Sequence, residues 1–187
     1  MSELFQYFNQ FLKLSKEAEL ALIEISTELK IKKNTVIQNV GQTCKTIYFI
    51  KRGVARIYYF KEDLEITESF AFENNILARV ESLFRNKPSK KAIQLLEDSE
   101  LIAINANLLF QLYDQFPEIE RLFRLIFESA YVDTVNRIET IQFHSAEERY
   151  KMLLNESSDV IKRVPLKYIA SYLGITPVSL SRIRAIK

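Results

Sequence analysis

Short runs of β-branched and aromatic residues fill the middle of the chain. They cover residues 46–50, 54–60, 65–70, 92–96 and 101–104. Such residues favour strands, and the glycine at position 53 and the polar segment after residue 96 mark turns between them. Strands that follow one another so closely are expected to pair as antiparallel hairpins around one core. The sequence therefore predicts a small antiparallel β-barrel or β-roll.

Helical patterns flank this strand-rich block. Apolar residues recur at spacings of three and four from residue 2 to about residue 30, which predicts helix there. Beyond the strands, Asn105 can cap a short helix, and Pro117 suits the first turn of a longer one. Ser145 and Glu148 have capping-box spacing at the start of a further helix. The predicted fold class is α+β, divided into a β-roll (1–116), a long helix (117–143) and a helical C-terminal unit (144–187).

The long helix carries two apolar stripes, and each stripe needs a surface to cover it. One surface can be the β-roll, and the other is most simply the same helix of a second copy related by a two-fold axis. The alternative is a helix buried in a single monomeric core. We therefore predict a homodimer. The expected interface residues are Leu122, Phe123, Ile126, Phe127, Ala130 and Tyr131.

Composition excludes several classes of protein. No apolar run is long enough to span a bilayer and the first residues lack a signal-peptide pattern, so we expect a cytoplasmic protein with no membrane partner. Cys44 is the only cysteine and His144 the only histidine, which is too few for a metal centre, an iron-sulfur cluster or a catalytic triad. We expect no enzyme, no metal and no cofactor. In this interpretation Cys44 is an inert thiol and His144 a linker residue.

Charge is unevenly distributed along the chain. The net charge is only +2, from 26 basic and 24 acidic residues. Six basic residues and no acid lie from Ile161 to Lys187, so this segment carries +6, and the remaining 20 basic and 24 acidic residues carry −4. Such an asymmetry places positive potential at one end of the molecule, where phosphates are attracted. The alternative is a solvated basic tail without a partner.

The last twenty or so residues have the pattern of two short helices joined by a tight turn. Pro165 begins the first helix, and Gly174 ends it because glycine adopts a left-handed conformation at the lowest cost. Ala170, four residues before the glycine, lets the second helix cross close to the first. Thr176 is a good N-cap and Pro177 suits the first position of the second helix. This is the spacing of a helix-turn-helix, although any α-helical domain can contain such a turn.

One face of the second helix is expected to be exposed and to fit the major groove of DNA, because Leu180 and Ile183 are turned inward. Arg182 is the best candidate for a base contact, since its planar guanidinium matches the edge of guanine. Other residues are expected to meet phosphates or bases. The complete predicted DNA-binding set is Lys167, Thr176, Val178, Ser179, Ser181, Arg182, Arg184 and Lys187.

The segment IASYLGITPVSLSRIR, residues 169–184, resembles the recognition region of the cyclic-AMP receptor and fumarate-nitrate-reduction regulator family. The run YFIKRGVARIYY, residues 48–59, resembles the β-roll of that family around its turn glycine, and the resemblance extends over the whole chain. It implies a cyclic-nucleotide-binding-like sensor domain, a dimerisation helix and a C-terminal winged helix. It also implies binding to palindromic double-stranded DNA, contact with RNA polymerase and control by a small-molecule effector. The wing is expected in residues 159–164.

Two departures from the family pattern matter. Members that bind cyclic nucleotides have a Gly-Glu pair for the ribose and an Arg-Ser or Arg-Thr pair for the phosphate, whereas this chain has Ala78-Arg79 and Ser89-Lys90. Without that carboxylate and guanidinium, cyclic AMP is not expected to bind. The predicted residues of a pocket for another, unknown effector are Arg79, Ser82, Ser89 and Lys90. Val178 stands where many members have a glutamate that reads cytosine, so a different DNA consensus is expected.

The functional prediction is a DNA-binding transcription regulator that acts as a homodimer. The alternative is a sensory or scaffolding protein that uses its β-roll to bind a ligand or a protein and does not bind DNA. The salt dependence of binding to duplex DNA separates the two, because phosphate contacts weaken as salt rises.

Overall fold

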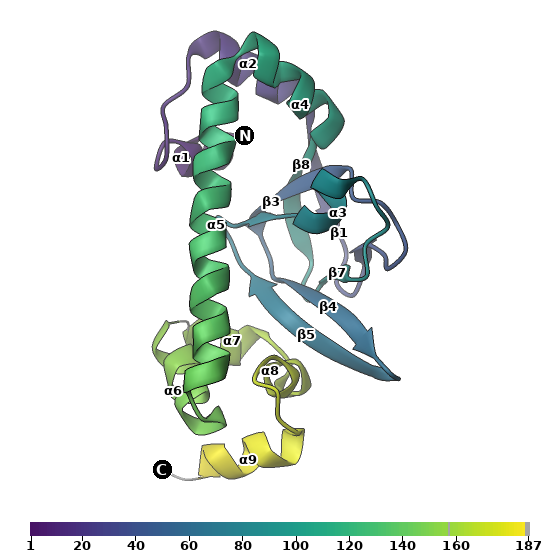
Figure 1. Cartoon of the computed structure of the whole chain (residues 1–187), viewed down its shortest axis with the longest axis vertical. Coiled ribbons are helices and arrows are strands. Elements are labelled where there is room, and N and C mark those ends of the chain that lie inside the picture. The colour runs from purple at the N-terminus through teal and green to yellow at the C-terminus, as the bar shows by residue number, and fades with distance from the viewer. Residues whose placement is uncertain (157, 186–187) are drawn as a thin grey trace.

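The long helix α5 (Pro117–Phe143) runs along the long axis of the molecule beside a β-structure (Figure 1). The computed structural model describes residues 1–156 and 158–185. Shorter helices lie near both ends of α5: α1 (Ser2–Phe8), α2 (Lys16–Glu24) and α4 (Ala106–Gln115) at one end, and α6 (Ala146–Glu156), α7 (Ser158–Arg163), α8 (Leu166–Tyr172) and α9 (Pro177–Ala185) at the other. In these described segments, no helix has both the length and the apolar character needed to cross a lipid bilayer.

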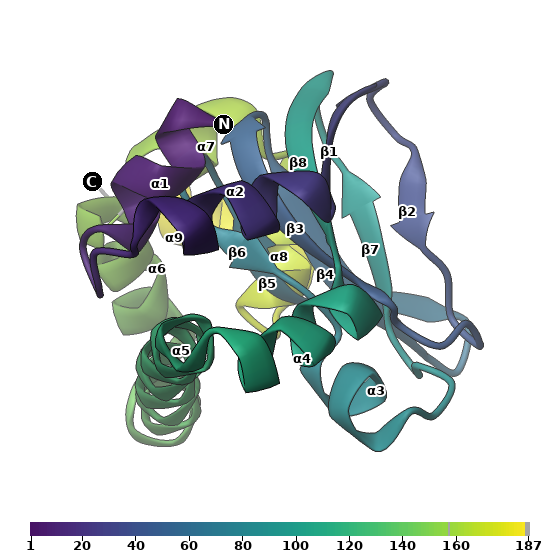
Figure 2. The same cartoon turned by 90° about the horizontal axis from the view of Figure 1, so that it is seen from above.

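Two four-stranded antiparallel sheets form the β-roll (Figure 2). The first sheet has the order β1 (Ser26–Ile31), β8 (Ser99–Asn105), β3 (Thr46–Arg52) and β6 (Ile76–Leu77). The second has the order β2 (Val36–Gln38), β7 (Ala92–Leu95), β4 (Ala55–Lys61) and β5 (Leu64–Ala71), and α3 (Val80–Arg85) follows β6. Ile50 and Leu101 from the first sheet pack with Ile57 and Leu95 from the second, so the two sheets enclose an apolar interior.

Gly53 lies where the chain leaves the first sheet and enters the second. It has a φ of +117°, and a Cβ atom at this position would lie 3.0 Å from the Cα atom of Ser99 and closer still to the Ser99 side chain. The backbone N–H of Gly53 donates to the carboxylate of Glu73 at 2.7 Å. Only glycine satisfies both the conformation and the close approach. Gly53 thus lies at the point where the chain crosses between the two sheets, since β3 and β4 do not pair with each other.

The predicted antiparallel α+β architecture is confirmed, but two local predictions are wrong. Residues 26–30 form the strand β1 instead of helix, because Leu29 and Ile31 alternate with exposed polar residues and pack on the interior between the sheets. The expected hairpin between residues 92–96 and 101–104 does not form, because β7 and β8 belong to different sheets. The connection between β7 and β8, like that between β3 and β4, crosses from one sheet to the other, so the strands that it joins do not pair as a hairpin.

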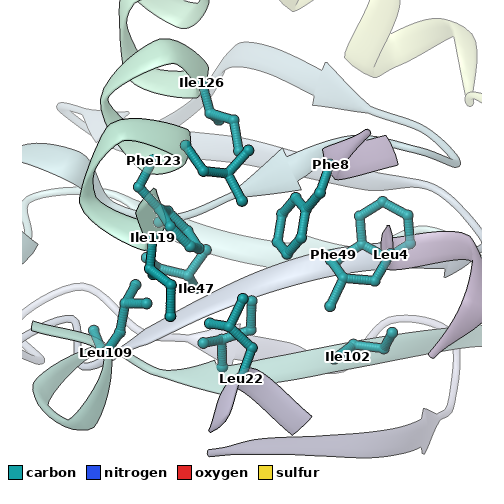
Figure 3. Packing of buried hydrophobic residues seen from close by; sticks show 14 of the residues in the cluster. Leu4, Phe8, Leu22, Ile47, Phe49, Ile102, Leu109, Ile119, Phe123 and Ile126 are labelled. Carbon is teal, nitrogen blue, oxygen red and sulfur yellow. The ribbon is translucent and has the colours of Figure 1, made fainter. Parts of the chain in front are cut away.

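A second apolar core joins α5 to the β-roll and to the N-terminal helices (Figure 3). Phe8 of α1 packs edge-on against Phe123 of α5, with ring centroids 5.7 Å apart. Leu122, Phe123 and Ile126 are 0%, 0% and 3% exposed within one chain. Their prediction as dimer-interface residues is therefore wrong, because the β-roll and the N-terminal helices already cover this stripe.

The predicted wing is also wrong. Residues 158–163 form α7, and in the described part of the chain no strand follows β8. Val160 and Val164, one helical turn apart, are 1% and 4% exposed and anchor this segment in the core of the C-terminal helices. A spacing of four places both side chains on one side of a helix, so that they reach this core together.

Candidate nucleic-acid interface

The turn between α8 and α9 has the predicted conformation. Gly174 has a φ of +70°, and its N–H donates to the carbonyl of Ser171 at 3.0 Å. The N–H of Ile175 donates to the carbonyl of Ala170 at 3.0 Å, which closes the end of α8. Ala170 is fully buried, so the small side chain allows α9 to approach α8 closely.

Helix α9 begins as the sequence predicts. The Thr176 hydroxyl accepts the backbone N–H of Ser179 at 3.1 Å, which is the hydrogen bond of an N-cap. Leu180 is 1% exposed and packs with Leu173 in the core of the C-terminal helices, and Ile183 is partly buried against the same core. These contacts orient the helix so that its opposite face lies on the surface of the molecule.

Most of the predicted DNA-binding residues lie on that exposed face. Val178 is 62% exposed, and Thr176, Ser181, Arg182 and Arg184 are also exposed, whereas Ser179 is partly buried and its hydroxyl lies 3.0 Å from that of Thr176. The hydroxyl of Ser181 donates to the carbonyl of Pro177 at 3.0 Å and keeps its acceptor capacity. Figure 1 places α9 at one extremity of the molecule, away from the β-roll.

Three basic residues at this end of the molecule have no acidic partner in the described part of the chain. Lys167, Arg182 and Arg184 are exposed, and no carboxylate of the described residues forms an ion pair with any of them. The ammonium of Lys167 lies 4.7 Å from the centroid of the Tyr168 ring. Lys187, also predicted to contact phosphate, lies outside the described residues. The surface around α9 therefore offers cationic groups that are available to an anionic partner.

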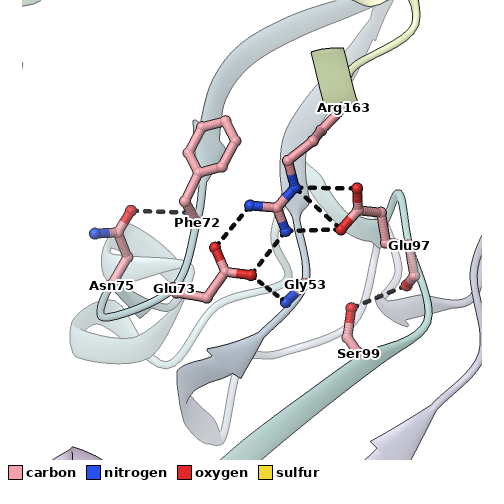
Figure 4. A network of polar contacts seen from close by, with 7 residues as sticks. All are labelled: Gly53, Phe72, Glu73, Asn75, Glu97, Ser99 and Arg163. Carbon is pink, nitrogen blue, oxygen red and sulfur yellow. Dashed lines mark hydrogen bonds and ion pairs between the residues drawn. The ribbon is translucent and has the colours of Figure 1, made fainter. Parts of the chain in front are cut away.

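An ion-pair network fixes α7 to the β-roll, and sequence reasoning did not find it (Figure 4). Arg163 donates to both oxygens of Glu73 at 2.8 and 2.7 Å, and to Glu97 at 2.7 Å. These hydrogen bonds lower the pKa of Glu73 to about 2 and raise the pKa of Arg163. Because Glu73 also accepts the N–H of Gly53, the network joins the C-terminal helices to the crossover between the two sheets.

Helix α8 is attached directly to strand β5. The hydroxyl of Ser171 accepts the N–H of Thr67 at 2.8 Å and donates to the carbonyl of Glu65 at 3.1 Å. The guanidinium of Arg56, which is 1% exposed, lies 3.7 Å from the centroid of the Tyr168 ring. The position of α9 is therefore set by the ion pairs of α7 with Glu73 and Glu97 and by the contacts of α8 with the β4–β5 hairpin.

An apolar strip remains exposed along α5 beyond the buried stripe. Tyr131, Val132, Ile138 and Ile141 are 71%, 56%, 49% and 52% exposed. Of the six predicted interface residues, Tyr131 and Ala130 are exposed and Phe127 is partly buried. Val132, which is exposed on the same strip, is not among those six residues.

Three of the four residues of the predicted effector pocket, Arg79, Ser82 and Ser89, find partners within the chain. Arg79 lies 3.8 Å from a carboxylate oxygen of Glu68, and Lys91 pairs with the same carboxylate. Ser82 and Ser89 are buried, and each hydroxyl donates to a nearby backbone carbonyl, of Lys87 and Lys91 respectively. Lys90 is exposed. The two serines therefore stabilise their own loops, and Glu68 neutralises Arg79.

Comparison with known proteins found one family model and several solved structures that are similar to this chain. Residues 28–116 match the family model described as the cyclic nucleotide-binding domain. A solved structure from Eubacterium rectale, described as a transcriptional regulator of the Crp/Fnr family, has a TM-score of 0.76 and 19% sequence identity, and the match covers 96% of this chain and 85% of that one. No curated protein sequence matches the chain.

Two further solved structures are similar over most of this chain and most of their own length. FixK2 from Bradyrhizobium japonicum has a TM-score of 0.74 and 16% identity, with 86% of this chain and 83% of that chain covered. CLP from Xanthomonas campestris, described as a c-di-GMP-responsive global regulator, has a TM-score of 0.73 and 16% identity, with 91% and 90% covered. The chain thus has the fold of the Crp/Fnr regulators, as the resemblance in sequence implies.

Proposed function

We propose that this chain, which has the Crp/Fnr fold, is a sequence-specific DNA-binding transcription regulator. The observation that carries the proposal is the exposed face of α9, which bears Val178, Ser181 and Arg182 at one extremity of the molecule. A short helix with a cationic exposed face and a buried apolar face is the element that enters the major groove in helix-turn-helix proteins. The amide groups at the start of α9 add a positive potential that favours phosphate.

The proposal includes a homodimer that pairs through α5. Its exposed strip of Tyr131, Val132, Ile138 and Ile141 extends along the C-terminal half of a 27-residue helix, and the β-roll does not cover it. A second copy of the same helix is the simplest occupant, because a two-fold axis lets one apolar strip cover another. Such a dimer presents two copies of α9 and reads an inverted repeat.

The proposal also includes a β-roll that does not bind cyclic AMP. The position of the family's ribose-binding carboxylate holds Arg79, and Ser89 directs its hydroxyl to a backbone carbonyl of its own loop. A cation in place of the carboxylate cannot accept a hydrogen bond from a ribose hydroxyl. Titration calorimetry with cyclic AMP is expected to give no binding heat.

The decisive experiment is selection of duplex DNA from a random pool with the purified full-length protein. A regulator is expected to return an inverted repeat whose half-site centres lie about 34 Å apart. Its affinity for the selected site is expected to fall linearly with the logarithm of salt concentration, with a slope of about −0.9 for each phosphate contacted. A protein that binds no duplex at any salt concentration would instead be a sensory or scaffolding protein.

A further inference from the structure

A polar pocket lies where the C-terminal half of α5 meets α6 and the end of α8. Its volume is about 380 Å³, within the range of small-molecule sites. Its polar walls include Asp133, Asn136 and Arg137 from α5, and Arg149 from α6. The pocket lies outside residues 28–116, the segment that matches the cyclic nucleotide-binding domain.

Arg149 brings a positive charge to this pocket without a carboxylate partner. It donates to the carbonyls of His144 at 2.5 Å and Leu173 at 2.8 Å. Its Nε atom is buried and has no hydrogen-bond partner in the described part of the chain, where no acidic group forms an ion pair with it either. A partly buried cation that is satisfied only by neutral carbonyls favours the entry of an anion.

Arg137 places a second guanidinium on the same pocket. It donates to the carbonyl of Tyr172 at 2.5 Å and lies 3.7 Å from the centroid of the Tyr172 ring. Both guanidiniums are thus held in place by the last carbonyls of α8. Fixed planar donors suit the oxygens of a carboxylate or a phosphate, because little side-chain entropy is lost on binding.

The other charged and polar residues of the pocket limit the kind of ligand that it can bind. Among the described residues that line it, Asp133 is the one acidic residue, so the charged groups of these walls, with Arg137 and Arg149, sum to +1. Asp133 is exposed, and Asn136 beside it can donate or accept a hydrogen bond. A ligand with one anionic group and a neighbouring polar group matches this arrangement.

We propose that this pocket binds a small metabolite that carries a carboxylate or phosphate group, and that its occupancy fixes the end of α8. The chain passes from Leu173 through Gly174 directly into α9, so the pocket and the exposed face of α9 share one short connection. Binding would hold α9 in one orientation relative to α5. The regulatory part of this inference rests on the proposed DNA-binding function, whereas the binding part does not.

The binding part is tested by calorimetric titration of the full chain with inorganic phosphate and, separately, with succinate, at constant ionic strength. At least one of them is expected to bind with one site per chain, and the arm that binds identifies the chemistry. Arg149→Met is expected to weaken binding about tenfold or more. Arg85→Met, which removes a guanidinium that is 69% exposed on α3, is expected to leave binding unchanged.

Asp133→Asn keeps the test valid if Arg149→Met fails to fold. Asp133 is exposed, and its neutralisation removes a negative charge that repels the ligand, so binding is expected to tighten severalfold. The proposal is overturned if neither anion binds, or if Asp133→Asn does not tighten binding. It is also overturned if binding survives in Arg149→Met but is lost in Arg182→Ala, since the anion would then occupy the surface of α9.

The regulatory part is tested by DNA affinity with and without the anion that binds. The affinity of the wild type for its selected site is expected to change in the presence of that anion at matched ionic strength, and the affinity of Arg149→Met is expected not to change. Equal DNA affinity in both conditions would refute regulation through this pocket. A chain that binds the anion but no duplex would refute the proposed DNA-binding function and leave the binding site in place.

Discussion

At the scale of single residues, Arg182 tests whether α9 reads bases. Its guanidinium is exposed and forms no ion pair within the described residues. We expect Arg182→Ala to weaken binding to the selected site by about 1 to 3 kcal/mol and to relax one base position, because a bidentate contact to guanine is lost. Fluorescence anisotropy with the selected site and with point-substituted sites measures both effects.

Lys167→Ala is the matched comparison on the same surface. Lys167 is exposed near the start of α8, and a lysine that contacts phosphate carries no sequence information. The variant is expected to weaken specific and random duplex alike and to reduce the salt slope by about 1. If Arg182→Ala behaves in the same way, Arg182 contacts the DNA backbone and does not read a base.

Gly53 tests how the two sheets are joined. Gly53→Ala would force a Cβ atom to within 3.0 Å of the Ser99 backbone at a φ of +117°. We expect a loss of more than about 2 kcal/mol in the free energy of unfolding, from strain and from displacement of β8. Urea denaturation followed by circular dichroism measures it.

Gly41→Ala is the control for that loss. Gly41 has a φ of +84°, but its Cβ would meet nothing within 4 Å, so only the backbone strain of about 1 kcal/mol is expected. Equal losses in the two variants would show that the contact with Ser99 does not matter.

Structural features that depend on neighbouring residues could be predicted from the sequence. Contacts between residues far apart in the sequence could not. The turn at Gly174, the N-cap of Thr176 and the inward position of Leu180 all follow from spacings within a few residues. The partners of Arg163 lie 90 and 66 residues away in the sequence, so no local pattern identifies them. The basic segment was therefore interpreted as solvated or DNA-facing, although Arg163 faces the β-roll.

At the scale of elements, the attachment of α7 to the β-roll gives a pH-dependent stability. Hydrogen bonds from Arg163 lower the pKa of Glu73 from 4.5 to about 2. Because the folded pKa lies below the unfolded one, the stabilisation is complete above about pH 4.5 and is lost as the pH falls toward 2. We expect Glu73→Gln to be less stable than the wild type at neutral pH and to lose less stability over this acidic range.

Urea denaturation at a series of pH values measures this difference. Glu81→Gln is a suitable control, because Glu81 is 72% exposed and, among the described residues, pairs with Arg85 alone, one turn along α3. It is expected to match the wild type within about 0.5 kcal/mol at every pH. A Glu73→Gln curve parallel to that of the wild type would contradict the role of this carboxylate.

The elements that sequence analysis missed are those whose conformation depends on distant parts of the chain that they pair with or pack against. Strand β1 forms because β8 pairs with it over six residues, and its own polar composition does not favour a strand. Helix α7 forms because Val160 and Val164 fill the core of the C-terminal helices. Long periodic elements such as α5 need no such partner to be recognised, which is why its pattern was clear from the sequence.

At the scale of the whole molecule, the sequence does not decide which apolar stripe of α5 packs on the β-roll and which is left for a second copy of the helix. Periodicity finds two stripes but does not assign them, because the core and a dimer interface have the same apolar character. The structure assigns Leu122, Phe123 and Ile126 to the core. The exposed strip that begins at Tyr131 and Val132 is left for the proposed second copy.

This assignment predicts opposite effects for two substitutions in α5. Ile126→Ala is expected to destabilise each chain by about 2 to 5 kcal/mol, because it leaves a cavity in the core. Val132→Glu is expected to leave the fold of each chain intact but to convert a dimer into a monomer, because a buried unpaired carboxylate on each side of a two-fold axis repels its copy.

Sedimentation equilibrium together with circular dichroism distinguishes these outcomes. The wild type and Leu20→Glu, which alters an apolar residue that is 60% exposed on α2, are expected to sediment as dimers. Val132→Glu is expected to sediment as a monomer with an unchanged circular dichroism spectrum. It is expected to bind a single half-site with much lower affinity than the wild type has for the inverted repeat, since the second α9 is no longer tethered. A wild-type monomer that still binds the inverted repeat, or a dimeric Val132→Glu, would show that α5 does not hold the two copies together.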